Sequence, residues 1–242
     1  NLILQDKTGM LDSKIWDPNS DGIGEFEVYD YVHVNGRVTV FNGMLQLSID
    51  RLSKAYDGDF NPADYLPVSR FDIEGMFSEF TGYIGTVSNP YVKKLLESFF
   101  VEDADVIRKF KSVSAAKSVH HGFVGGLLEH SLGVTKLAAI YSDTYPMLNR
   151  DLMISGAMLH DIGKIREFSA FPENDYTNEG NLIGHLVIGS EMITEKVKNI
   201  PGFSESDIAE IKHCILAHHG ELEYGSPKKP ALAEAIALYM AD

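Results

Sequence analysis

Histidines and aspartates at the ends of apolar runs restrict the fold of this chain more than any other sequence feature. His160 and Asp161 follow the apolar run 153–159, and Asp242 follows the apolar run 235–241. A carboxylate at the end of such a run is costly to bury unless it is paired or binds a metal ion. The runs themselves predict helices. The second half of the chain is therefore expected to be a helical bundle in which polar groups meet.

The ligand-type residues of this half form a widely spaced series, so that each lies on a different predicted helix or helix end. In chain order they are His130, His160, Asp161, His185, His218, His219 and Asp242. Taken singly, a buried histidine is more often a hydrogen-bonded core residue, and the pair His218-His219 also suits a helix C-terminus. Imidazoles and carboxylates that converge from several helices commonly build a metal site. The complete series favours that interpretation.

The order His, His-Asp, His, His-His, Asp resembles the metal-dependent HD phosphohydrolase superfamily over residues 120–242, which implies an all-α domain. The resemblance implies that one ion is held by His130, His160, Asp161 and Asp242. It also implies that Asp161 bridges to a second ion, held by His185 with His218 or His219. Mixed imidazole and carboxylate ligands suit Mn²⁺, Fe²⁺ or Mg²⁺, and the many histidines favour Mn²⁺ or Fe²⁺. Two divalent ions are expected, with Mn²⁺ the first choice.

The first 56 residues have the pattern of short strands. Strands are predicted at 2–5, 10–16, 28–41 and from residue 45 onward, because apolar residues alternate there. Asn42-Gly43 between the last two is a strong hairpin signal. Gly36 inside the long strand indicates a bulge or a barrel corner. We expect a small β-barrel that is incomplete at its start, because the chain begins within a strand.

Helical patterns follow from about residue 57. Pro90 predicts the start of a helix over 91–100, Ser204 is a predicted N-cap, Gly220 a predicted stop, and Pro230 the predicted opening of the last helix. The expected fold class is multidomain, α and β. Its expected parts are a barrel at 1–56, a connecting helical segment at 57–119 and the all-α domain at 120–242.

The strand pattern, together with residues 5–9 and 14–17, resembles an OB-fold nucleic-acid-binding barrel. An OB-fold followed by an HD domain is similar to the YhaM-type 3′→5′ exoribonucleases, and the stretch 120–130 is close to that family. The resemblance implies a metal-dependent 3′→5′ exonuclease that hydrolyses single-stranded RNA to nucleoside monophosphates, with single-stranded DNA left open as a second substrate. A metal-activated water would attack the phosphodiester, with Asp161 and Lys164 as catalytic residues.

Several residues are candidates for holding the substrate, and each has an alternative interpretation. Lys164, about one turn after Asp161, would clamp a phosphate oxygen or stay solvated. Lys117, at the end of a basic run, would contact phosphate or belong to a solvated helix face. His120 and His121 would contact substrate or orient metal ligands. Candidates on the barrel for stacking on bases and gripping the backbone are Trp16, Tyr31, Arg37 and Phe41, whose aromatic members are alternatively core residues.

The composition limits which partners and which compartment we expect for this chain. A net charge of −14 argues against a protein that coats itself in phosphate backbone, although one local groove remains possible. The single cysteine, Cys214, forms no internal disulfide, which suits the cytoplasm. No run approaches the roughly 18 apolar residues that span a bilayer, so no membrane is expected as a partner, while homo-oligomers are left open. Two other functions remain: a phosphohydrolase for small nucleotides or cyclic dinucleotides, and a non-enzymatic nucleic-acid-binding factor with a structural metal.

Overall fold

The structure is a computed structural model that describes residues 1–6, 8–56, 58–61, 64–116 and 122–242. Contacts between residues divide the chain into two compact units, Asn1–Pro67 and Val68–Asp242. The helices of the expected connecting segment 57–119 lie in the second unit, because they begin after residue 67. Strands in the first unit and helices in the second confirm the predicted fold class of mixed α and β.

The N-terminal unit is built on one four-stranded sheet with the strand order β1-β2-β4-β3. Its outer pairs, β1 with β2 and β3 with β4, are antiparallel, whereas β2 and β4 are parallel. The pairings among the described residues leave this sheet open, so a closed barrel stays a prediction. The strands are β1 (Leu2–Asp6), β2 (Gly9–Ile15), β3 (Val32–Phe41) and β4 (Met44–Lys54).

The hairpin and the bulge predicted for this unit are both present. Asn42 and Gly43 join β3 to β4 with positive φ angles of 51° and 78°, the backbone of a two-residue hairpin turn. The register of β3 against β4 shifts between Asn35 and Gly36. A Cβ atom at Gly36 would lie 2.2 Å from the backbone oxygen of Ser48, so only glycine fits there. The prediction that this strand begins at residue 28 is wrong, because β3 starts at Val32 after a left-handed residue, Tyr29.

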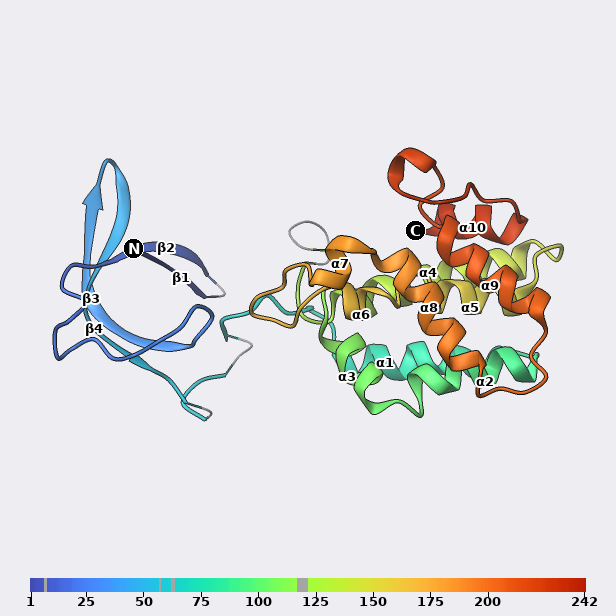
Figure 1. Cartoon of the computed structure of the whole chain (residues 1–242), viewed down its shortest axis with the longest axis horizontal. Helices are drawn as coiled ribbons and strands as arrows, with labels where there is room; N and C mark the ends of the chain where they lie inside the picture. Colours follow the sequence, from blue (N-terminus) through green and yellow to red (C-terminus); the bar gives the residue numbers. More distant parts are fainter. Residues whose placement is uncertain (7, 57, 62–63, 117–121) are drawn as a thin grey trace. The chain divides into compact units, whose positions relative to one another are not determined.

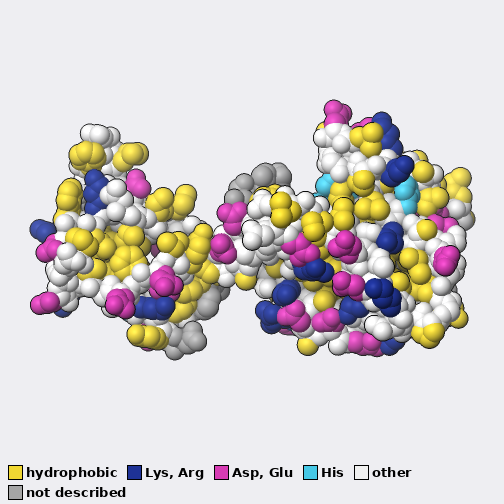
Figure 2. Space-filling model, in the orientation of Figure 1, with side chains coloured by type: hydrophobic (Ala, Val, Ile, Leu, Met, Phe, Trp, Pro, Cys, Tyr) yellow, Lys and Arg dark blue, Asp and Glu magenta, His cyan; other side chains and the backbone are white. Residues whose placement is uncertain are grey.

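The sheet has a small core and an exposed opposite face. Leu47, Ile49 and Leu52 are buried, and Leu11 and Ile15 pack against them. Alternate residues of a strand point to opposite faces, so the residues between these face away from the core. Hydrophobic side chains are nevertheless abundant on the surface over the strands, as Figure 2 shows. This unit therefore displays apolar side chains that its own core does not use.

The second unit is helical, as Figure 1 shows. Its first part contains α1 (Ile73–Gly82), η2 (Tyr83–Thr86), α2 (Pro90–Phe100) and α3 (Ala104–Ser112). Its second part contains α4 (Gly126–Thr144), α5 (Arg150–Leu159), α6 (Lys164–Glu167), α7 (Asn178–Leu182), α8 (His185–Val197), α9 (Glu205–Ala217), η3 (Leu222–Tyr224) and α10 (Ala233–Ala241).

Two of the predicted helix starts have the expected capping residues, and the predicted start of the last helix is wrong. Asn89 caps α2 through its side-chain oxygen, with Pro90 at the first helical position, and Ser204 caps α9. Pro230 does not open the last helix, which begins at Ala233 after Leu232. The backbone N–H of Ala231, just after Pro230, instead donates to His213 Nε2 on α9, so the chain is still a loop at that point.

Helix α5 lies at the centre of the helical unit. Every residue from Leu152 to Leu159 is buried, and α5 packs against α2, α4, α9 and α10. Full burial of one large apolar side chain contributes about 1.5–3 kcal/mol, so this packing fixes the end of α5 firmly. Among the described residues, no helix combines the length and apolar character needed to cross a membrane.

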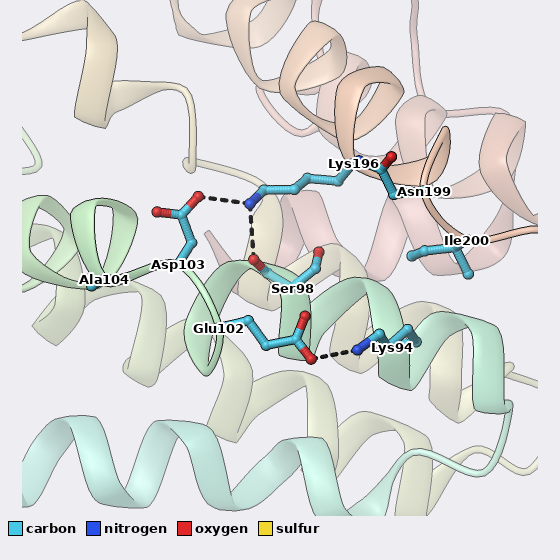
Figure 3. Close-up of a pocket in the computed structure, with 8 residues that line it drawn as sticks. All are labelled: Lys94, Ser98, Glu102, Asp103, Ala104, Lys196, Asn199 and Ile200. Carbon is cyan, nitrogen blue, oxygen red and sulfur yellow. Dashed lines mark hydrogen bonds and ion pairs between the residues drawn. The ribbon is translucent and has the colours of Figure 1, made fainter.

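A polar clamp also holds α8 against the turn between α2 and α3. Lys196 Nζ donates to Asp103 Oδ2 at 2.7 Å and to the backbone oxygen of Ser98 at 2.9 Å, as Figure 3 shows. These residues line a surface hollow of about 340 Å³. Asp103 also caps α3. The charged residues that line the hollow are paired with each other, so we interpret it as a contact that stabilises the packing of α8 rather than as a binding site.

Candidate metal centre

The histidines and aspartates of the series meet where several helices of the second unit end. His160 directly follows α5, His218 directly follows α9 and Asp242 directly follows α10. His130 lies in the first turns of α4, and His185 is the first residue of α8. The C-terminal end of a helix carries partial negative charge, which favours a cation. Three such ends at one place therefore favour positive charge there.

Backbone carbonyls hold three of the imidazole rings in one tautomer. His160 Nδ1 lies 2.8 Å from the oxygen of Ala157, and His218 Nδ1 lies 2.7 Å from the oxygen of Ile215. His219 Nδ1 lies 3.0 Å from the oxygen of Tyr224. A carbonyl oxygen only accepts hydrogen bonds, so each Nδ1 carries the proton. The Nε2 lone pairs are then available as ligands, the arrangement usual around metal-binding histidines.

The first group of possible ligands contains His130, His160 and Asp242, whose ligand atoms lie within 4.8 Å of one another. His130 Nε2 is 2.9 Å from Asp242 Oδ1 and 3.0 Å from His160 Nε2. Two imidazole nitrogens at this distance repel each other unless a proton or a cation lies close to both. The group therefore has the spacing and the chemistry of one ion site.

The second group contains His185, His218 and His219, again with ligand atoms within 4.8 Å of one another. His185 Nε2 lies 3.3 Å from His219 Nε2. The sequence left open whether His218 or His219 belongs to the site, and the structure brings both rings to it. These three nitrogens come from α8 and from the residues that follow α9.

Asp161 lies between the two groups. Its Oδ2 is 3.4 Å from the Nε2 atoms of His130 and His160, whereas its Oδ1 is 3.5 Å from His185 Nε2 and 3.6 Å from His218 Nε2. Its side chain is only 1% exposed. One carboxylate oxygen thus faces each group, which is the position of a bridging ligand.

Burial and close pairs set the charge states in this cluster. Burial disfavours a charge on Asp161, but Lys164 and His160 outweigh it and hold the pKa of Asp161 well below its ordinary value. Burial also acts to lower the pKa of His160, but Asp161 and Asp242 outweigh it and raise that pKa to about 10. Burial lowers the pKa of His218 to about 4. The cluster therefore favours ionised carboxylates and positive charge between them.

This donor set fits a divalent cation. Metal ions bind ionised carboxylates and neutral imidazoles, so a bound ion would take the place of the proton that the carboxylates favour on His160. Asp161 Oδ1 is buried and has no hydrogen-bond partner among the residues that the structure describes. Such an oxygen is costly to bury unless another group binds it. The residues present therefore suit one or more metal ions.

Lys164 lies at the edge of the cluster. It is the first residue of α6, and its Nζ donates to Asp161 Oδ2 at 2.6 Å. Its side chain is 15% exposed. Lys164 is thus paired with Asp161, and its role as a phosphate clamp stays a prediction. Lys164 neutralises part of the charge on Asp161 and remains open to solvent on one side.

The candidates on the N-terminal unit divide into two kinds. Trp16 and Phe41 are 72% and 58% exposed, so neither is a core residue. Arg37 is exposed and pairs with Asp50 at 3.3 Å. Tyr31 instead stacks on Phe60 with ring centroids 3.9 Å apart and contacts Tyr65 edge-on at 5.5 Å. Tyr31 therefore belongs to a packed aromatic cluster. The remaining candidates, Lys117, His120 and His121, lie outside the described residues.

Sequence reasoning missed one residue that touches the cluster, Glu167. Its carboxylate is buried and contacts His185 Nδ1 at 3.0 Å. The sequence places this glutamate between two apolar residues, Ile165 and Phe168, which would have indicated that its side chain is buried. It does not indicate the partner, His185, which lies 18 positions further along the chain.

Comparison with known proteins agrees with this geometry. The HD domain family model matches residues 127–242, so the helical unit carries an HD domain. Curated proteins named 3′-5′ exoribonuclease YhaM match all of this chain. The proteins from Listeria welshimeri and a Geobacillus strain are each 35% identical to it, over 76% and 74% of their own length. The Bacillus subtilis protein is 33% identical over 76% of its length. No solved structure gives a significant match.

The chain belongs to the YhaM family of 3′-5′ exoribonucleases. The resemblance inferred from the order of histidines and aspartates is thereby confirmed. So is the predicted enzyme class, a hydrolytic nuclease with an HD domain.

Proposed function

We propose that this protein is a metal-dependent 3′→5′ exonuclease that removes nucleoside monophosphates from single-stranded RNA. The relatives are named for such an activity. The observation that carries the proposal is the position of Asp161, whose two oxygens each face one group of histidines. This arrangement is typical of centres that hold two ions a few ångströms apart and act on phosphate esters.

The proposed ligands follow from the two groups. His130, His160, Asp161 and Asp242 would hold one ion, and Asp161, His185, His218 and His219 would hold the other. Bound divalent ions would polarise the phosphoryl group and lower the pKa of the attacking water. The nitrogen and oxygen ligands favour Mn²⁺, with Fe²⁺ and Mg²⁺ as alternatives.

The residues of this chain supply positioning and charge. Helix ends and Nδ1 hydrogen bonds keep the imidazole rings oriented. Lys164, which is partly exposed beside Asp161, would donate to a phosphate oxygen of the substrate. Its ammonium group acts as a point charge, which suits phosphate.

The exposed face of the N-terminal sheet would hold the strand of RNA. Lys14 Nζ lies 5.2 Å from the ring centroid of Trp16 and 5.3 Å from that of Phe41, so a cation lies close to two exposed rings. The register aligns Lys14 and Arg37 on either side of Ser48. Aromatic rings stack on any base, and cations contact the backbone, so such a surface binds single strands with little sequence preference. Single-stranded DNA would then bind as well.

A time course on a 5′-labelled single-stranded RNA of about 20 nucleotides tests this proposal. A ladder that shortens with Mn²⁺ and stays intact with EDTA is the expected result. An intact oligonucleotide, combined with turnover of mononucleotides or cyclic dinucleotides, would replace the proposal with a small-nucleotide phosphohydrolase. If neither is turned over although metal raises the melting temperature, the site is structural.

A further inference from the structure

Glu167 makes two contacts with one metal-site residue. Its Oε1 accepts the backbone N–H of His185 at 2.9 Å and lies 3.0 Å from His185 Nδ1. The residue is 6% exposed. A carboxylate that is ionised only accepts, so Nδ1 carries the proton and Nε2 is left as the ligand atom. Both contacts come from the same oxygen, which fixes the backbone and the ring of His185 together.

The backbone contact also supplies a cap that α8 otherwise lacks. The N-cap residue Gly184 has no side chain, and the first N–H groups of a helix need acceptors. Glu167 provides an acceptor and a negative charge at the positive end of α8. The first residue of that helix is therefore held at the site by a side chain from α6.

The segment around Glu167 is built to hold it in place. Its backbone oxygen accepts the N–H of Thr177 at 2.9 Å, and a Cβ atom at Gly180 would lie 2.3 Å from the same oxygen. Glu167 therefore has little freedom to leave His185.

This contact distinguishes His185 from three other rings of the cluster. His160, His218 and His219 donate from Nδ1 to neutral backbone carbonyls. Of these four rings, His185 alone has a carboxylate as its described Nδ1 partner. A carboxylate on the far nitrogen makes an imidazole a stronger donor to a metal and fixes its orientation.

We propose that Glu167 is a positioning residue that orients His185 and strengthens the three-histidine group as an ion site separate from the group of His130, His160 and Asp242. The inference rests on the proposed metal-dependent function. It adds that loss of the Glu167 charge weakens one of the two ion sites selectively.

The test is a titration of the chain with Mn²⁺, without RNA, in which the electron paramagnetic resonance signal of free Mn²⁺ reports binding. The Glu167→Gln variant keeps an oxygen acceptor but removes the charge. We expect one class of sites to bind about 10–100-fold more weakly than in the wild type, with the other class unchanged. In the Asp242→Asn background, where the three-histidine group is intact, adding Glu167→Gln should weaken the remaining site by the same factor.

Glu179→Gln is the matched control, because it makes the same chemical change in the same segment and its side chain pairs with Arg166 rather than a histidine. It should titrate like the wild type. Glu167→Asp keeps the charge and should regain part of the affinity, which a purely structural role would not produce. Unchanged Mn²⁺ binding in Glu167→Gln, or equal weakening of both classes, would overturn the inference. So would a wild-type chain that binds a single ion. The time course on labelled RNA tests the exonuclease activity separately, so failure of that proposal can be told apart from failure of this one.

Discussion

The two units of the molecule hold their candidate functional residues in opposite environments. In the helical unit, His160, Asp161 and His218 are at most 1% exposed and sit at the ends of packed helices. In the N-terminal unit, Trp16 and Phe41 are mostly exposed and contribute little to the core. Phosphoryl transfer is accelerated by charges that the fold holds in fixed positions, whereas accessible aromatic rings favour binding of a flexible single strand. Substitutions should therefore separate cleavage from binding according to the unit they fall in.

The largest effect is expected from Asp161. Asp161→Asn removes the charge that faces both ligand groups, so cleavage of RNA should fall by at least about 10²–10³-fold, the loss typical for one preorganised electrostatic group. Binding of labelled RNA, measured by fluorescence anisotropy in EDTA, should stay close to wild type. Cleavage at the wild-type rate would remove Asp161 from the mechanism.

Substitution of the exposed rings should have the reverse pattern. Trp16→Ala should weaken binding of single-stranded RNA by about 1–3 kcal/mol, because one stacked base loses its platform, and Phe41→Ala should do the same. The melting temperature should change little, because both rings are exposed. If these variants bound RNA as tightly as the wild type, or if they unfolded, the exposed rings would not be binding residues and the contrast between the two units would be wrong.

Tyr31 should behave as a core residue although it lies in the same unit. Tyr31→Ala removes its stacking on Phe60 and its contact with Tyr65. An aromatic pair contributes about 0.5–1.5 kcal/mol beyond area burial, so denaturant unfolding should show a loss of at least that size in the N-terminal unit. Tyr31→Phe, which keeps the ring, is the control. Weaker RNA binding at unchanged stability would instead make Tyr31 a base-stacking residue.

The smallest effect is expected from the clamp of Figure 3. Lys196→Met should lower the stability of the helical unit by about 1 kcal/mol, since both partners are partly solvated. The Lys196 ammonium lowers the pKa of Asp103 below its ordinary value of 3.8. The clamp therefore stabilises the folded state above about pH 4 and loses this effect as pH falls through the folded-state pKa. The stability difference between Lys196→Met and wild type should shrink over that range, and a constant difference would contradict the assignment.

From the sequence we expected the histidines and aspartates of the series to meet, and the structure brings His130, His160, Asp161 and Asp242 together. Their role as metal ligands stays a prediction. A polar residue that follows a long apolar run is drawn into the interior with it, and burial there is costly unless the polar group is paired. The hairpin at Asn42-Gly43 was predictable for a local reason, since it depends on the backbone freedom of two residues.

What the sequence did not predict depends on contacts between distant residues. Glu167 becomes a partner of His185 only when α6 and α8 pack together. Trp16 and Tyr31 are both aromatic residues beside strands, yet one is exposed and the other packed. Trp16 follows the inward-facing Ile15, so strand alternation turns it outward, whereas Tyr31 precedes β3 and meets Phe60 from a later loop. Local pattern carries no information on that partner.

The meeting of α10 with α4 has a consequence for folding. His130 and Asp242 come from opposite ends of the ligand series, and their atoms are 2.9 Å apart only when the intervening helices have packed. Bringing residues so distant in sequence together costs the entropy of closing a long loop, and contacts of this kind slow folding. A chain in which α4 and α10 have not packed together therefore lacks a complete metal centre. Hydrolytic activity in this protein is thus a property of the finished fold, and free metal stabilises only that state.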